Sequence, residues 1–314
     1  MSRVHGNAHG LVDWSRRDPW TERMADMIEK HLRPACEAND LAVEELAEVI
    51  GPLATTALDC AFEDCCATVW EDGSNLASDY LKRRGWKETA INRAYIEALR
   101  SSVMSLYEVS DVRPGESFLA RDLLRGGEPV RVIERTATKT LVAWDMIAAR
   151  IVTVRGKTQL TSAVLAVERS LAEEILGIFG RTKERLQRET GDALKRATPE
   201  LRARFEAELA DPDQLLRSAA STITTVWLNA AIRRCLAPPP QLANTDGEPL
   251  EFISLHYRIA SGASAAKIAA VLAGIPNLRA EGDGARWTLF APEALAPKRR
   301  GKASAEPAAG RTIH

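Results

Sequence analysis

The sequence has few of the residues that build metal sites and disulfide frameworks. It contains five histidines and five cysteines in 314 residues, and of the cysteines only Cys60, Cys65 and Cys66 lie close together. A zinc site needs four ligands, usually from paired spacings such as Cys-x2-Cys, and this cluster has neither that spacing nor a nearby histidine. We therefore expect the thiols to pack as small buried hydrophobes in a reducing cytoplasm. We also expect no metal and no cofactor.

An excess of charge is also absent. Lysine plus arginine number 42 against 43 for aspartate plus glutamate, which gives a net charge of −1. A protein that binds nucleic acid through bulk positive charge is excluded, so any such binding must be local. The hydrophobic fraction of 45% is enough to bury the cores of two or three domains.

Long hydrophobic runs and common catalytic motifs are missing too. The sequence predicts neither a signal peptide nor a membrane span, and it indicates a cytoplasmic protein. It contains neither Gly-x-Ser-x-Gly nor Gly-x-Gly-x-x-Gly. Gly156-Lys157-Thr158 resembles the end of a phosphate-binding loop, but Ile151 stands where that motif needs its first glycine. These residues are expected to form a turn at the end of a strand.

The period of the apolar residues divides the chain into segments. Residues 20–105 follow a helical period, and at Leu106 the period changes from 3.6 to 2. Short alternating stretches separated by turns then predict a small antiparallel sheet, with six side chains directed inward: Val109, Val130, Val132, Ile147, Ile151 and Val154. Strands this short are expected to close into an SH3-like or OB-like barrel. Helices should resume at about Ser162.

Three consecutive prolines at 238–240 mark a linker. Beyond it, residues 250–259 read as a strand, 264–273 as a helix and 278–290 as a hairpin. The fold class is therefore α+β. The predicted domains are a helical domain (1–105), a small β-barrel (106–160), a helical segment (161–237), a β-α-β-β domain (238–290) and a disordered tail (291–314).

One candidate site is acidic. Carboxylates that could hold a hard cation or act as paired acids gather in the second predicted helix and just after it: Asp59, Glu63, Asp64, Glu71 and Asp72. No helical Glu-x-x-His partner completes a carboxylate metal site. The favoured interpretation is an acidic helix face exposed to water, and the alternative is a metal-dependent hydrolase that uses residues 59–72.

A second candidate site is basic. Two predicted helices meet at Gly85, in the outline of a helix-turn-helix. The candidate nucleic-acid contacts around this turn are Lys82, Arg83, Arg84, Lys87 and Arg93. The competing interpretation is a helix end whose basic residues complement the helix dipole. Upstream, Trp14 and Trp20 are expected to pack onto the helical domain.

Several stretches carry a family resemblance. They are Ser105-Leu-Tyr-Glu-Val-Ser, Pro114-Gly115 and Arg121-Asp-Leu-Leu-Arg-Gly-Gly-Glu-Pro-Val. Because of these stretches, the chain resembles a group of uncharacterised bacterial proteins in which N-terminal helices precede a small SH3-like β module. The resemblance is strongest over residues 75–155. Some related modules occur beside a SEC-C zinc motif, whose Cys-x-Cys this chain lacks. The resemblance implies a fold and a bacterial origin, and it supplies no active site.

Together these observations predict a cytoplasmic binding or adaptor protein that is not an enzyme. Its expected partner is either a protein or a nucleic acid, and no membrane binding is expected. The sequence leaves the oligomeric state open.

Overall fold

The computed structural model describes residues 8–194, 198, 213–238, 262, 264–274, 278–281, 284–288 and 312–313. The chain divides into two compact units, Met1–Ala237 and Pro238–His314. Helices and strands both contribute to each unit, so the predicted α+β class is confirmed. Within the described residues, no helix is long and apolar enough to cross a membrane.

Helices form the front of the first unit. Asn75 and Thr89 begin two of them, because their side chains accept hydrogen bonds from the backbone N–H groups of Ser78 and Asn92. Gly51, with a φ of 56°, ends another. The helices are α1 (His9–Ser15), α2 (Trp20–Glu37), α3 (Leu46–Ile50), α4 (Leu53–Ala67), α5 (Leu76–Arg84) and α6 (Ala90–Arg100), with short 3₁₀ turns η1 (Val43–Glu45) and η2 (Gly85–Lys87).

A five-stranded antiparallel sheet follows, in the order β3-β2-β1-β4-β5. Arg155 and Gly156, both with positive φ, form the two-residue turn between β4 and β5. The strands are β1 (Met104–Arg113), β2 (Ser117–Asp122), β3 (Val130–Ile133), β4 (Met146–Val154) and β5 (Lys157–Val167), with the 3₁₀ turn η3 (Ala137–Lys139) between β3 and β4.

The sheet curls without closing. A small core fills its concave side, and it includes Tyr107, Phe118, Val132 and Ile147. The edge strands β3 and β5 approach each other, but no ladder of hydrogen bonds joins them. The sheet is therefore open, and the closed SH3-like or OB-like barrel predicted from the sequence is not present.

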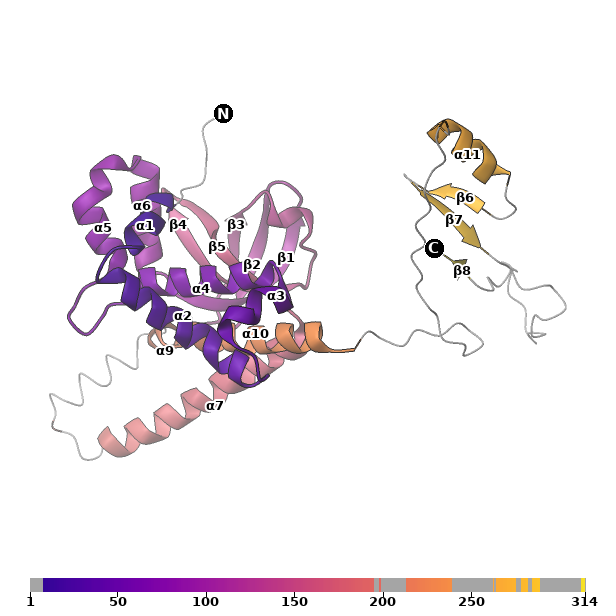
Figure 1. Ribbon diagram of the computed structural model, residues 1–314. Helices are drawn as coiled ribbons and strands as arrows, with labels where there is room; N and C mark the ends of the chain where they lie inside the picture. Colours follow the sequence, from indigo (N-terminus) through magenta and orange to yellow (C-terminus); the bar gives the residue numbers. More distant parts are fainter. Residues whose placement is uncertain are drawn as a thin grey trace. The chain divides into compact units, whose positions relative to one another are not determined.

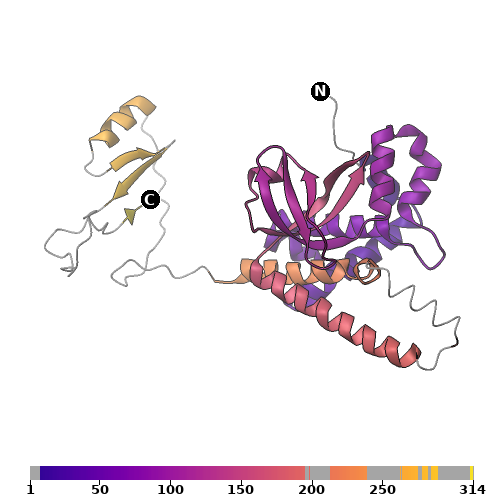
Figure 2. The same ribbon diagram turned by 180° about the vertical axis from the view of Figure 1, so that it is seen from behind.

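The convex side of the sheet is covered by helices. Leu106, Ala148 and Leu165 alternate with the concave-side residues and pack into the largest core, together with α2, α4 and α10 (Ala220–Leu236). Figures 1 and 2 show these three helices along one side of the sheet, while α5 and α6 stand at its end. Strand β4 is buried on both faces over most of its length and carries only two polar residues, Arg150 and Thr153.

The first half of helix α7 (Arg169–Leu194) packs on α10. Its later half extends away from the body (Figure 2), and the side chains described there are mostly exposed. A short helix, α9 (Gln214–Arg217), precedes α10.

The structure corrects the predicted sheet in four places. Residues 162–167, predicted as helix, belong to β5, and the helix begins only at Arg169. Val130, predicted to point inward, is 44% exposed, because it begins the edge strand β3. Ile151 is half-buried. Val154 is buried, but on the opposite face of the sheet, in a core shared with α2, α5 and α6. The inward positions of Val109, Val132 and Ile147 are confirmed.

The second unit contains α11 (Ala265–Ala273) and a small sheet of β6 (Leu278–Glu281), β7 (Gly284–Thr288) and β8 (Thr312–Ile313). Strands β6 and β7 pair as the predicted hairpin. The strand predicted at 250–259 lies outside the described residues. Strand β8, which pairs with β7, lies in the stretch predicted to be a disordered tail.

Candidate functional site

The five carboxylates of the acidic candidate do not gather in one place. Asp59 is half-buried, and burial raises the pKa of its carboxyl. Glu71 and Asp72 are exposed. Glu63 and Asp64, by contrast, are only 2% and 3% exposed, so the expected water-exposed face is wrong for these two residues. Within the described part of the chain, no cluster of three His, Cys, Asp or Glu side chains could hold a metal ion.

Glu63 binds the backbone of the neighbouring strand. At Arg150 the register between β4 and β5 shifts, and three residues of β5 bulge out of the ladder. The Glu63 carboxylate accepts hydrogen bonds from Ser162 N (2.8 Å), Ala163 N (3.1 Å) and Thr161 Oγ1 (2.7 Å). It thus satisfies the donors that the bulge leaves without strand partners. Burial raises the pKa of Glu63 to about 7 against the opposing effect of the nearby Arg150 charge.

Asp64 joins the sheet to the helices through buried charges. Its Oδ1 accepts a hydrogen bond from Arg150 Nη2 at 2.5 Å, and its Oδ2 lies 3.1 Å from His31 Nε2. His31 Nδ1 in turn lies 3.1 Å from Thr224 Oγ1 on α10. Burial alone would raise the pKa of Asp64, but the His31 hydrogen bond and the Arg150 charge lower it below its ordinary value.

This network has no access for a substrate. The side chains of His31, Asp64 and Arg150 are at most 4% exposed, and none of them lines either of the two pockets considered below. A catalytic acid or base must reach the reacting atoms. We therefore assign Glu63 and Asp64 to holding α4 against the sheet, and the hydrolase alternative loses its main carboxylates.

The five basic candidates fall into two groups. Arg83 pairs with Asp79 at 2.7 Å, and Arg84 lies over the Trp14 ring. Asp79 also accepts hydrogen bonds from the indole nitrogens of Trp14 and Trp20, which confirms that these tryptophans pack onto the helical front. Arg83 and Arg84 are thus engaged within the protein.

Lys82, Lys87 and Arg93 form the second group, around a shallow groove between α5, η2 and α6. The groove has a volume of about 530 Å³, and Lys82, Arg93 and the 71% exposed Trp86 line it. Lys87 Nζ lies 5.2 Å from the centre of the Trp86 ring. Among the described residues, no carboxylate forms an ion pair with these three cations. We call this groove, lined by Lys82, Trp86, Arg93 and Glu97 with Lys87 over the Trp86 ring, the Trp86 groove. Its carboxylate, Glu97, pairs with Arg100.

Sequence reasoning found the cations of this groove but not its aromatic residue. Trp86 follows Gly85 within the basic stretch, at the point where α5 ends. A tryptophan in the turn between two short helices has no helical face on which to be buried. That position was the available signal that its ring is exposed.

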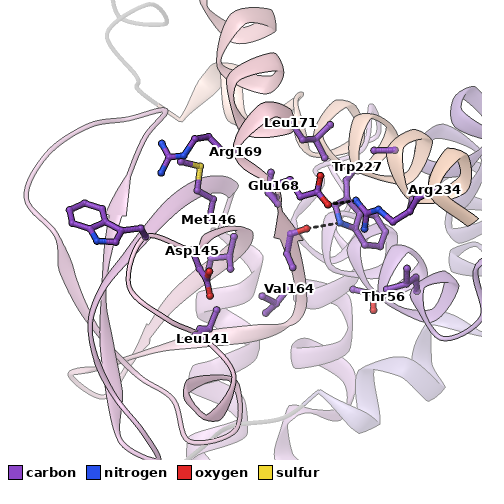
Figure 3. Close-up of a pocket in the computed structure, with 17 residues that line it drawn as sticks. Thr56, Leu141, Asp145, Met146, Val164, Glu168, Arg169, Leu171, Trp227 and Arg234 are labelled. Carbon is purple, nitrogen blue, oxygen red and sulfur yellow. Dashed lines mark hydrogen bonds and ion pairs between the residues drawn. The ribbon is translucent and has the colours of Figure 1, made fainter. Parts of the chain in front are cut away.

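A second pocket went unpredicted. It has a volume of about 510 Å³ and lies between the ends of β4 and β5, the loop 141–145, and helices α4, α7 and α10. Figure 3 shows its labelled side chains, with the Glu168–Arg234 ion pair at one end and Met146 and Arg169 at the other. Its residues come from stretches as far apart in the chain as Leu53 and Arg234, so no local pattern could reveal it.

Comparison with known families gives one match. The model of a family of unknown function (DUF7986) matches residues 67–196. This stretch runs from the end of α4 through α7 and includes the Trp86 groove and the loop 141–145. Comparison with curated proteins and with solved structures gives no match.

Proposed function

We propose that this protein is a binding protein, not an enzyme, and that its Trp86 groove binds single-stranded nucleic acid. The observation that carries the proposal is an exposed tryptophan ring with three cations around it that form no ion pair with the described carboxylates. Such proteins combine a base stacked on an aromatic ring with cations that contact the phosphates.

The geometry favours a single strand over a duplex. A base can stack on Trp86 only when it is not already stacked between its neighbours in a duplex. A helix that reads the major groove needs free polar side chains at its start. At the start of α6, Asn92 already donates to Glu88. The remaining cation there, Arg93, faces the same groove as Trp86. The Trp86 residue is 71% exposed, and its ring could not contact the face of a base that is stacked inside an intact duplex.

Fluorescence anisotropy with labelled single strands of about 20 nucleotides tests this proposal. Replacing Lys82, Lys87 and Arg93 together with alanine should reduce the slope of log K against log salt by about 2, since each phosphate contact in a single strand contributes roughly 0.7. Trp86→Ala should weaken binding by about 5-fold to 100-fold, and Trp86→Phe should retain most of it.

Arg83→Ala is the matched control. It removes the same charge as Lys82→Ala from the adjacent position, but the Arg83 guanidinium is held by Asp79. We expect it to change affinity much less than Lys82→Ala. Absence of binding to single-stranded DNA and RNA at low salt, or an equal effect of the two substitutions, would contradict the proposal. Capture of a protein from a lysate that survives nuclease would then favour the adaptor alternative.

A further inference from the structure

The pocket beside loop 141–145 is independent of the Trp86 groove, and its walls are mostly apolar. Trp227 holds one wall in place, because its indole nitrogen donates to the carbonyl oxygen of Ala166 on β5 at 2.9 Å. Met146, Val164 and Leu171 line the pocket with it. A volume of about 510 Å³ lies within the usual range of roughly 300–1,000 Å³ for small-molecule sites.

Two carboxylates and two guanidiniums line this pocket, and its positive end is the one at Arg169. Glu168 pairs with Arg234 at 2.6 Å, and Asp145 Oδ2 accepts a hydrogen bond from Val142 N at 2.8 Å. Among the described residues, Arg169 is the lining cation for which no ion pair is found. It begins α7, whose first turn contains no acidic residue. The first N–H groups of a helix have no partner within the helix, and they favour an anion.

Trp144 stands at the rim of the pocket in an unusual conformation. Its φ is 77°, a region that bulky residues rarely adopt. Two backbone hydrogen bonds impose it, from Trp144 N to Val109 O and from Val109 N to Asp145 O, both 2.8 Å long. The residue is 65% exposed, and nearby Val142 is 61% exposed. Strained residues of this kind concentrate at binding sites.

We propose that this pocket binds a small organic anion with an apolar body. The body lies against Met146, Leu171 and Trp227, and the rim indole of Trp144 covers it. The anionic group lies at Arg169 and the first turn of α7. Glu168 is neutralised by Arg234, so the positive end is not cancelled from that side.

Two fluorescent probes that share one ring system test the proposal on the full chain. Anilinonaphthalene sulfonate carries an anionic group, and phenylnaphthylamine is the same body without it. We expect the sulfonate to bind with one site per chain and about 10-fold more tightly than the neutral probe. Arg169→Gln should remove this preference and leave the affinity for the neutral probe unchanged. Arg233→Gln removes an exposed arginine outside the pocket, and it should change neither affinity.

A second variant tests the location. Ala230 lines the pocket from α10, and Ala230→Phe should fill it and abolish binding of both probes. Circular dichroism checks that this variant folds, and if it does not, the Arg169→Gln comparison decides alone because that residue is exposed. Unchanged sulfonate binding in Ala230→Phe, equal affinity of wild type for the two probes, or no effect of Arg169→Gln would overturn the proposal.

Discussion

Glu63→Gln should make the stability of the protein less dependent on pH. Glu63 is 2% exposed, and burial raises the pKa of its carboxyl from the ordinary 4.5 to about 7. A raised pKa means that the folded state prefers the protonated acid. The stability associated with this proton is fully present below about pH 4.5, and it is lost as the pH rises through about 7.

The magnitude follows from the interval between the two pKa values. At about 1.36 kcal/mol per pH unit, the change from 4.5 to about 7 corresponds to roughly 3 kcal/mol. Most of it falls between about pH 5 and pH 8. Glutamine does not titrate, and its amide oxygen can still accept from Ser162 N and Ala163 N. Wild type should therefore lose about 2 to 3 kcal/mol of unfolding free energy relative to Glu63→Gln over this range.

Urea unfolding followed by tryptophan fluorescence at several pH values measures this difference. All other titrating groups are common to both proteins, so their contributions cancel. Glu71→Gln is the matched control, because Glu71 is exposed to water, and its difference from wild type should stay constant. A constant difference for Glu63→Gln, or a gain of wild type over the variant as the pH rises, would refute the argument.

Four further substitutions have expected outcomes. Asp64→Ala leaves the buried guanidinium of Arg150 without its carboxylate, so it should cost about 3–5 kcal/mol of unfolding free energy. Arg83→Ala breaks an exposed pair and should cost under about 1 kcal/mol. Equal costs of the two substitutions in urea titration would contradict this expectation. Of the five thiols only that of Cys235 is exposed, so a thiol reagent should label one cysteine per native chain, and none in Cys235→Ser. Trp144→Gly relieves a positive φ, so it should leave the unfolding free energy unchanged or raise it by up to about 1 kcal/mol. It should also weaken the binding of both naphthalene probes. A large loss of stability would contradict the assigned strain.

The local features of the fold could be predicted from the sequence. Short alternating stretches predicted the antiparallel sheet after Leu106, and the helical period of the apolar residues predicted the helices before it. Strand β5 was missed because its bulge interrupts the alternation after Leu160. Leu165 and Val167 then continue the helical spacing of α7, so the strand and the helix read as one element.

The sites depended on contacts that no local pattern records. Glu63 meets its partners in β5 about 100 residues later. One signal was nevertheless present, because α4 is apolar around nearly its whole circumference. A helix of that kind is buried, and carboxylates on it require partners. The basic residues around the turn at Gly85 could be predicted as a group because they are neighbours in sequence.

The pairing of α4 with the sheet limits how the chain can be divided. The stretch matched by the family model, residues 67–196, includes Arg150 and the bulge of β5 but begins just after Glu63 and Asp64. A fragment cut to that stretch would leave the Arg150 guanidinium without its carboxylate and the N–H groups of Ser162 and Ala163 without their acceptor. It would also expose the apolar face of the sheet that α2, α4 and α10 cover. The stretch is therefore not self-sufficient. Any chain that keeps an arginine at this point of the sheet has to bring a carboxylate to it from another part of its sequence.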